Sequence, residues 1–427
     1  MNQVNEQVVQ VGGLNFHLVP SKKFKTLNFV VKFKGKLDRS TITKRALLPY
    51  LLQQGTNRYP SRSKLQQKLD DLYGAVLSID GTKKGNSHII TFRLEIPNQR
   101  FLENESKLIE STIELLNEVI TNPNVSENSF DSAIVDREKE TLKQKISSIL
   151  DDKMSYANMR LIDEMCENEV YKTHVHGYVD DLPKLDEKNL FAYYQSMLSD
   201  DSVDLYVLGD FEEEEMKNTV KNIMKKEFTS NKSIESTADE KKKDVEKNTV
   251  TEKQELQQAK LHIGYRTNCT YSDELYAGLQ VFNGMFGGFP NSKLFINVRE
   301  KNSLAYYASS RLESHKGLLF VFSGIAPKDF KQAKEIMDEQ MTAMKNGDFI
   351  EDEISSTKEL IINQLLETLD HPQGIIEMLY QQVVANHSLT PDMLIAKIQN
   401  VKKQDILDVA NGIQEDTTYL LTTNGEG

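Results

Sequence analysis

Residues 283–307 read NGMFGGFPNSKLFINVREKNSLAYY, and this segment says the most about a chain of 427 residues. Its glycines are not followed by the Lys-Ser/Thr pair of a P-loop, and they lack the strand-G-x-G-x-x-G-helix order of a dinucleotide site. We therefore interpret Gly284, Gly287 and Gly288 as positions where another part of the chain, a substrate or a partner approaches closely.

The same segment contains an arginine and a tyrosine, Arg299 and Tyr306, that are seven positions apart. Arginine presents a rigid fork of donors, and tyrosine presents one directed hydroxyl. Fixed donors of this kind stabilise the negative charge that develops on a carbonyl oxygen during amide hydrolysis. Residue types alone favour a structural interpretation, in which Arg299 lies on a helix surface and Tyr306 is a half-buried strand residue, because most such pairs are structural.

A second informative segment is residues 43–56, which read TKRALLPYLLQQGT. Its leucines recur at helical spacing and predict a buried helix face; they are Leu47, Leu48, Leu51 and Leu52. In zinc peptidases with the inverted motif H-x-x-E-H, two histidines one turn apart bind the metal and the glutamate activates water. When the segment is aligned on its final Gly-Thr, Ala46 and Tyr50 take the histidine positions and Pro49 takes the glutamate position. None of these three residues can perform those roles.

Together the two segments resemble the pitrilysin, insulinase and mitochondrial-processing-peptidase family. Residues 283–307 resemble its C-terminal signature, a glycine-rich turn, then S-x-L-F, then V-R-E-K-x-x-L-A-Y, and residues 55–60 (GTNRYP) resemble the sequence after its zinc helix. The resemblance implies that Arg299 and Tyr306, which we call the clamp, bind substrate backbone and support the oxyanion at a zinc site in the other half or another subunit. The chain thus resembles a member that has lost the metal and kept the clamp.

The third zinc ligand of that family is a glutamate on a downstream helix. Residues 136–146 (DREKETLKQKI) resemble this helix, E-R-E-R-x-V-I-L-x-E-I, and place Lys145 at the ligand position. A lysine would repel zinc, so we expect no metal on this chain and zinc on a partner.

His174 and His176 form an H-x-H pair. Two ligands do not make a zinc site, and the segment also resembles a family position that reads H-P-Y-G.

The sequence also indicates two copies of one unit that are joined by a linker. Residues 229–255 contain no aromatic residue and few large aliphatic residues, so we expect a charged, flexible linker there. The segments 63–97 and 292–327 correspond at a nearly constant offset of 229 to 230 positions, which indicates internal duplication. We predict an N-terminal half over residues 1–228 with the degenerate zinc motif, and a C-terminal half over residues 256–427 with the clamp.

Each predicted half begins with strands, runs through a helix and further strands, carries long amphipathic helices and finishes on a strand. This order predicts an α+β fold in which each half is an antiparallel-rich mixed sheet with helices packed on one face. The family resemblance implies that the halves close like a clam around a chamber, in which a peptide is held as an added strand.

The composition narrows the class of protein further. A formal net charge of −12 argues against a nucleic-acid surface. No segment approaches the ~18 consecutive apolar residues of a membrane span, and the N-terminus resembles neither a signal peptide nor an organellar presequence. We therefore expect a cytoplasmic bacterial protein with no membrane partner. Cys166 and Cys269 lack C-x-x-C spacing and are expected to be buried free thiols.

Three functional hypotheses remain. The first is a non-catalytic subunit of a heterodimeric zinc metallopeptidase: a homologous partner supplies H-x-x-E-H, and this chain supplies half the chamber and the substrate-binding residues Arg299, Tyr306, Gly287 and Gly288. The alternative is a metal-free scaffold or peptide-holding protein with no peptidase in its complex. By resemblance alone this alternative includes a link to elongation factor P modification, for which some ligand-less relatives in Gram-positive bacteria are named. The third, an independent enzyme with a displaced metal site, is disfavoured because the sequence offers no three-ligand cluster.

Overall fold

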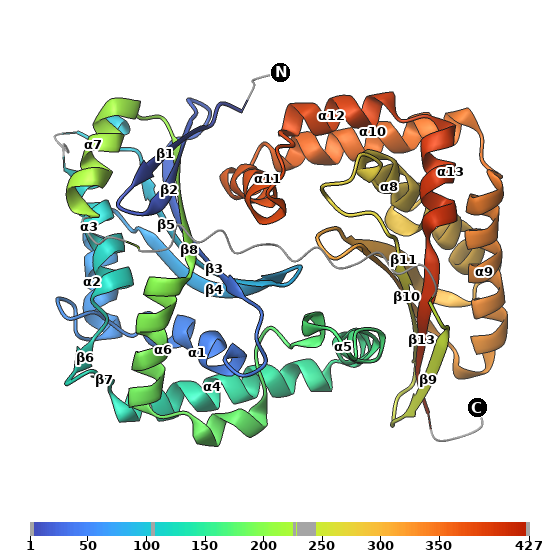
Figure 1. Ribbon diagram of the computed structural model, residues 1–427, viewed down its shortest axis with the longest axis horizontal. Coiled ribbons are helices and arrows are strands. Elements are labelled where there is room, and N and C mark those ends of the chain that lie inside the picture. The colour runs from blue at the N-terminus through green and yellow to red at the C-terminus, as the bar shows by residue number, and fades with distance from the viewer. Residues whose placement is uncertain (1–3, 104–106, 225–227, 229–244, 424–427) are drawn as a thin grey trace. The chain divides into compact units, whose positions relative to one another are not determined.

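The chain folds into two compact units (Figure 1). The computed structural model describes residues 4–103, 107–224, 228 and 245–423. Unit 1 comprises the described residues of Met1–Ser148 and Thr173–Glu235, and unit 2 those of Ile149–Lys172 and Ser236–Gly427. The predicted boundary at residue 228 stays a prediction, and residues 229–244 of the predicted linker lie outside the described residues.

Unit 1 contains a six-stranded mixed sheet in the order β1-β2-β8-β3-β5-β4. The pairing of β2 with β8 is parallel, and the other pairings are antiparallel. The strands are β1 (Gln7–Val11), β2 (Leu14–Pro20), β3 (Thr26–Lys36), β4 (Val76–Lys84), β5 (Ser87–Pro97) and β8 (Ser202–Gly209). A separate small hairpin joins β6 (Val125–Ser126) to β7 (Ser129–Phe130).

Helices cover one face of this sheet because alternate strand residues on that face are apolar. Leu27, Phe29, Val31 and Phe33 of β3 are buried in one core together with the four leucines of α1, as the helical spacing predicts. The helices are α1 (Ile42–Leu52), α2 (Arg62–Asp71), α3 (Leu108–Thr121), α4 (Ser132–Asp151), α6 (Glu187–Asp200) and α7 (Glu213–Ile223), with the 3-10 turns η1 (Gln99–Phe101) and η3 (Val179–Lys184).

Unit 2 contains a five-stranded sheet in the order β11-β12-β10-β13-β9. Its strands are β9 (Asn248–Lys253), β10 (Ala259–Arg266), β11 (Ala305–Glu313), β12 (Leu318–Ile325) and β13 (Gln414–Thr422). Its helices are α5 (Lys153–Met165), α8 (Tyr276–Asn283), α9 (Phe330–Asn346), α10 (Glu351–Thr368), α11 (Pro372–Ala385), α12 (Pro391–Asn400) and α13 (Lys403–Gly412). The short turns are η2 (Val170–Lys172), η4 (Gly284–Gly288), η5 (Phe295–Lys301) and η6 (Pro327–Asp329).

The two sheets share one topology, which confirms two homologous halves. Reading outward from the parallel pair, β9-β13-β10-β12-β11 matches β2-β8-β3-β5-β4 strand for strand, with the same chain order and the same directions. Tyr73 and Ser303, which are 230 positions apart, both adopt positive φ, 60° and 52°, just before the corresponding edge strands β4 and β11. The duplication therefore extends to the conformation of a single turn residue.

The predicted flexible linker is wrong for residues 248–253, because these form β9. This strand pairs in parallel with β13, as β2 pairs with β8 in unit 1. The second half therefore begins before residue 256. The sequence misled because β9 is an edge strand whose side chains are mostly exposed, so it needs few apolar residues.

One segment from the first half of the sequence belongs to unit 2. Most helices of unit 2 lie on one face of its sheet, and α5 lies on the other (Figure 1). Ala157, Leu161 and Met165 of α5 form a buried cluster there with residues of β12 and β13. Gly264 of β10 allows this approach, because a Cβ there would lie 2.5 Å from the Met165 sulfur.

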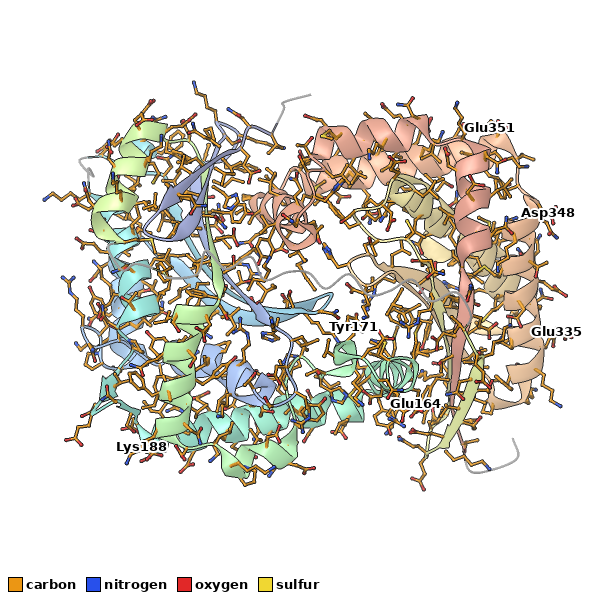
Figure 2. All side chains as sticks on the ribbon, viewed as in Figure 1. Glu164, Tyr171, Lys188, Glu335, Asp348 and Glu351 are labelled. Atoms are coloured by element: carbon orange, nitrogen blue, oxygen red, sulfur yellow. The ribbon has the colours of Figure 1, made fainter. Side chains whose placement is uncertain are left out.

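A buried ionic network holds the end of the same segment. Glu169 forms ion pairs with Arg266 at 2.8 Å and with Lys316 at 2.7 Å, and Arg266 also donates to Asp416 at 2.8 Å. Although burial opposes ionisation, the two cations lower the pKa of Glu169 to about 2. Figure 2 labels Glu164 near the end of α5 and Tyr171 in η2, which come before and after Glu169 in the sequence.

Candidate functional site

The helix at the zinc-motif position, α1, carries no metal ligand at the three motif positions. Ala46 is buried, Pro49 lies inside the helix and lacks an N–H, and Tyr50 is half-buried against the core of unit 1. Burial and the nearby Glu138 carboxylate of α4 raise the pKa of the Tyr50 hydroxyl. Tyr50 therefore remains a neutral phenol, which is a poor ligand for zinc.

Lys145 lies on the same face of α4 as Glu138, because the two residues are seven positions apart. The pKa of His176 is lowered, mainly by burial and in addition by the nearby exposed ammonium group of Lys145. His174 instead stacks on Tyr178, with ring centroids 4.7 Å apart. The described residues contain no group of three His, Cys, Asp or Glu side chains arranged to hold a metal ion.

A buried ion pair that the sequence did not predict anchors the start of α1. Arg45 pairs with Asp201 and donates to the Phe33 carbonyl at 2.9 Å and to Nδ1 of His88 at 3.0 Å. Burial and the Arg45 guanidinium hold the pKa of His88 well below its ordinary value. Because Nδ1 accepts a hydrogen bond, His88 is the neutral tautomer that carries its proton on Nε2.

The H-x-H segment docks onto the same end of α1 within unit 1. Thr43 donates to Asp181 at 2.7 Å, and its hydroxyl accepts a hydrogen bond from the Tyr178 N–H at 3.1 Å. Arg39 pairs with Asp181 at 2.6 Å and lies 3.6 Å from the centre of the Tyr178 ring. Gly177, with φ of +73°, approaches Thr43 so closely that a Cβ would lie 2.5 Å from its hydroxyl. These contacts fix a loop, and they assemble no catalytic group.

Arg299, the first clamp residue, lies on the π-helical turn η5 with its side chain exposed. Its guanidinium lies 4.7 Å from the centre of the Phe295 ring, one turn earlier. In the part of the chain that the structure describes, the Arg299 side chain makes no hydrogen bond and no ion pair. Its donors are therefore available to a ligand.

Tyr306, the second clamp residue, is not half-buried, because 73% of it is exposed. It lies on the edge strand β11 at a register shift between Ala305 and Tyr307, where it is the extra residue of a bulge. A bulge redirects a side chain at a sheet edge. Among the described residues, the Tyr306 hydroxyl has no hydrogen-bond partner. The structure thus presents the two clamp side chains to solvent.

The backbone between the clamp residues forms a tight turn. The Ser303 N–H donates to the Arg299 carbonyl at 3.1 Å, and the Leu304 N–H donates to the Val298 carbonyl at 3.0 Å. On another side of η5, the Asn297 amide donates to Gln340 of α9 at 2.8 Å. These contacts hold η5 in place within unit 2, so both clamp side chains project from a backbone that is fixed by hydrogen bonds.

The two site glycines lie in and at the end of the π-helical turn η4. A Cβ on Gly287 would lie 2.6 Å from the Ser310 hydroxyl and 2.8 Å from the Ser310 amide nitrogen on β11. Gly288 is exposed, and a Cβ there would lie 3.0 Å from the Asn283 amide. Gly287 is therefore a close-approach position within unit 2. Contact of either glycine with a substrate stays a prediction.

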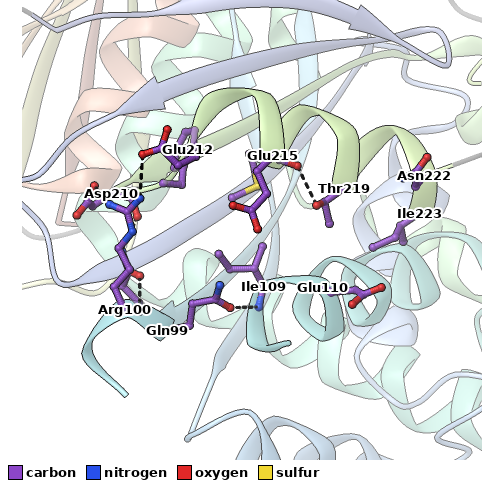
Figure 3. Close-up of a pocket in the computed structure, with 13 residues that line it drawn as sticks. Gln99, Arg100, Ile109, Glu110, Asp210, Glu212, Glu215, Thr219, Asn222 and Ile223 are labelled. Carbon is purple, nitrogen blue, oxygen red and sulfur yellow. Dashed lines mark hydrogen bonds and ion pairs between the residues drawn. The ribbon is translucent and has the colours of Figure 1, made fainter. Parts of the chain in front are cut away.

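A cavity of about 210 Å³ lies elsewhere, between α3 and α7 of unit 1 (Figure 3). Arg100 at its rim pairs with Asp210 at 2.5 Å and with Glu212 at 3.2 Å. None of the site residues predicted from the sequence lines this cavity. The candidate site is therefore the exposed clamp on unit 2 and not this cavity.

Comparison with known proteins identifies the class. Residues 184–361 match the Peptidase M16 inactive domain. The chain is 48% identical to "Probable inactive metalloprotease YmfF" of Bacillus subtilis (strain 168) over 99% of this chain and 98% of that protein. The chain therefore belongs to the M16 peptidase family, as a homologue without the catalytic metal site.

Two further relatives are informative. A crystal structure of a conserved protein from Enterococcus faecalis V583 has a TM-score of 0.90 at 35% identity, covering 99% of this chain and 100% of that one. "Uncharacterized zinc protease YmxG" of Bacillus subtilis (strain 168) is 24% identical over 57% of this chain and 58% of that protein. In the described part of the chain, no helix has the length and apolarity that a membrane crossing requires.

Proposed function

We propose that this protein is the non-catalytic subunit of a heterodimeric zinc metallopeptidase, and that it lends Arg299 and Tyr306 to the active site of a homologous partner. The observation that carries the proposal is the contrast between the two motifs. The motif positions Ala46, Pro49, Tyr50 and Lys145 hold no zinc ligand. Both clamp side chains are exposed and have no hydrogen-bond or ion-pair partner among the described residues. The chain therefore offers exposed donors to a substrate carbonyl and no metal ligand at the motif positions.

The proposed partner is an M16 homologue that carries H-x-x-E-H and binds zinc. A probable inactive metalloprotease and a zinc protease of one organism are both similar to this chain, which supports pairing of a ligand-less chain with a metal-bearing one. The proposed compartment is the cytoplasm. A zinc ion on the partner would supply the activation of water, and Arg299 and Tyr306 would donate to the peptide carbonyl on which negative charge develops.

The proposed substrate is an extended peptide. β11 lies at the edge of its sheet, which supports binding of a peptide as an added strand, a mode of pairing that places few demands on sequence. Tyr306 lies on that strand and Arg299 lies just before it. The proposed division of labour assigns peptide binding to the C-terminal half, with Gly287 and Gly288 near the peptide.

The test begins with purification of the tagged chain from its native organism. We expect a homologue with H-x-x-E-H to copurify in stoichiometric amount, together with about one zinc ion per complex. A zinc-free homodimer or a lone chain would refute the proposal and favour the scaffold alternative.

The reconstituted complex then tests the clamp. We expect Arg299→Ala to lower kcat by about 10²- to 10³-fold, the usual cost of removing one oxyanion donor, and Tyr306→Phe to lower it in the same direction. Assembly should be unchanged because both side chains are exposed. Arg62→Ala, at an exposed arginine of α2, is the matched control and should leave kcat unchanged. Unchanged kinetics in both clamp variants would contradict the assignment.

A further inference from the structure

We infer that Phe295 is a positioning residue for the clamp: its ring holds the Arg299 guanidinium in the orientation that a substrate carbonyl requires. The inference rests on the proposed function, and it adds a residue to which that function assigns no role. The geometry behind it is the cation–π contact of 4.7 Å between the Arg299 guanidinium and the Phe295 ring.

An exposed arginine without an ion pair normally samples many rotamers, and ordering it on substrate binding costs entropy. Arg299 has no carboxylate partner among the described residues. The ring below it is therefore the contact that restricts its side chain before a ligand arrives. When a guanidinium stacks on a ring, its N–H groups lie in the guanidinium plane and point away from the ring, so they can still donate to a ligand.

The spacing along η5 makes the contact a property of this turn. Phe295 and Arg299 are four positions apart, which places them on one side of a helical turn. Asn297 lies between them in sequence and points elsewhere, because its amide bonds Gln340 on α9 at 2.8 Å and the Lys293 carbonyl at 2.9 Å. The anchored side of η5 fixes the backbone, and the Phe295 side orients the arginine.

A carboxylate in place of the ring would orient the arginine by occupying its donors. An aromatic ring orients it through the face of the guanidinium and leaves the donors unoccupied. Phe295 therefore performs a role that an acidic neighbour could not perform without competing with the substrate. The half-buried environment of Phe295 is consistent with one ring face available to the guanidinium.

The experiment compares Phe295→Leu, which keeps apolar bulk, with Phe295→Tyr, which keeps the ring. In the reconstituted complex we expect Phe295→Leu to lower kcat/KM by about 2- to 5-fold, the factor that corresponds to an exposed cation–π contact. Phe295→Tyr should restore the wild-type value. In an Arg299→Ala background, Phe295→Leu should have no further effect. An equal loss in that background would overturn the inference, because it would indicate a packing role.

A second measurement separates this inference from the proposed function. In the isolated chain, the Arg299 Nε–H resonance, assigned through Arg299→Lys, should carry a ring-current shift that disappears in Phe295→Leu and persists in Phe295→Tyr. If the complex is inactive but this shift is present, the proposed function fails and the stacking stands. If the resonance is the same in wild type and Phe295→Leu, the stacking is refuted whatever the complex does.

Discussion

His17 of unit 1 lies between two carboxylates. Its Nδ1 is 2.7 Å from Glu6 and its Nε2 is 3.1 Å from Asp204, and its ring stacks on Tyr206 at 4.0 Å. Ionised carboxylates only accept hydrogen bonds, so both ring nitrogens donate and the buried ring is an imidazolium. Burial lowers the pKa of His17, but the hydrogen bonds and charges of Asp204 and Glu6 outweigh it and raise the pKa.

Because of His17, we expect the free energy of unfolding of the protein to depend on pH. Because the folded pKa is raised, His17 contributes its full stabilisation below about pH 6.5, its unfolded value, and loses it as pH rises through the folded pKa. We expect His17→Gln to lower the free energy of unfolding by about 1–3 kcal/mol at pH 5.5 and by clearly less at pH 9. Urea titrations at both pH values measure this difference.

The control for that measurement is His371→Gln, which removes an exposed histidine at the start of α11. It should change the free energy of unfolding by no more than about 0.5 kcal/mol at pH 5.5. A destabilisation by His17→Gln that grew toward pH 9 would show that the ring is neutral when buried, against the geometry.

At the scale of single residues, the family resemblance assigned the clamp to Arg299 and Tyr306 and indicated the missing zinc ligands, and the clamp assignment stays a prediction. The sequence did not predict the bulge that exposes Tyr306 or the contact of Arg299 with Phe295. Both depend on how a turn and an edge strand meet the rest of unit 2, and no periodic pattern records that. The buried pair of Arg45 and Asp201 was missed for the same reason, because its members are far apart in sequence.

At the scale of elements, α5 and the turn after it depend on Glu169. We expect Glu169→Gln to lower the free energy of unfolding at pH 7 by about 2–4 kcal/mol, because it removes a carboxylate that pairs with both Arg266 and Lys316. The depressed pKa of about 2 means that this contribution is present above pH 4.5 and is lost as pH falls toward 2.

Denaturant titrations from pH 7 down to pH 3 measure that loss. The matched control is Glu335→Gln on α9, an exposed glutamate labelled in Figure 2, which should have little effect at any of these pH values. Equal effects of the two substitutions at pH 7 would mean that the network around Glu169 does not stabilise unit 2.

Elements were predicted well where their burial is periodic and poorly where it is not. The leucines of α1 and the alternating strands gave the architecture of both halves, since each has an apolar face of fixed period. β9 was missed because one apolar residue, Val250, among polar neighbours is enough for an edge strand. Its existence follows from the duplication, since β2 requires a counterpart beside β13.

At the scale of the whole molecule, the chain should fold without metal. Four positions of the zinc motif carry non-ligands, and the described residues offer no alternative three-ligand group. A bound ion would stabilise the native state by mass action, so its removal would lower the melting temperature. We expect excess chelator to shift the Tm of the isolated chain by less than about 1 °C, while it abolishes turnover by the proposed complex.

Differential scanning calorimetry with and without chelator, together with elemental analysis for zinc, checks this expectation. The zinc-bearing homologue treated in the same way is the control and should lose its metal. A stoichiometric metal ion on the isolated chain, or a shift of several degrees, would contradict the expectation and revive the hypothesis of a displaced metal site.

The grouping of residues 149–172 with unit 2 has a genetic consequence. Recombination between related genes at the predicted linker would exchange strands β9–β13 without the helix that covers their second face. The recipient would then combine α5 and Glu169 of one lineage with the Gly264 contact, Arg266 and Lys316 of another. No single crossover can therefore exchange unit 2 alone, because β8 follows α5 in the sequence but belongs to unit 1. We expect α5 and the sheet that it covers to coevolve as one unit.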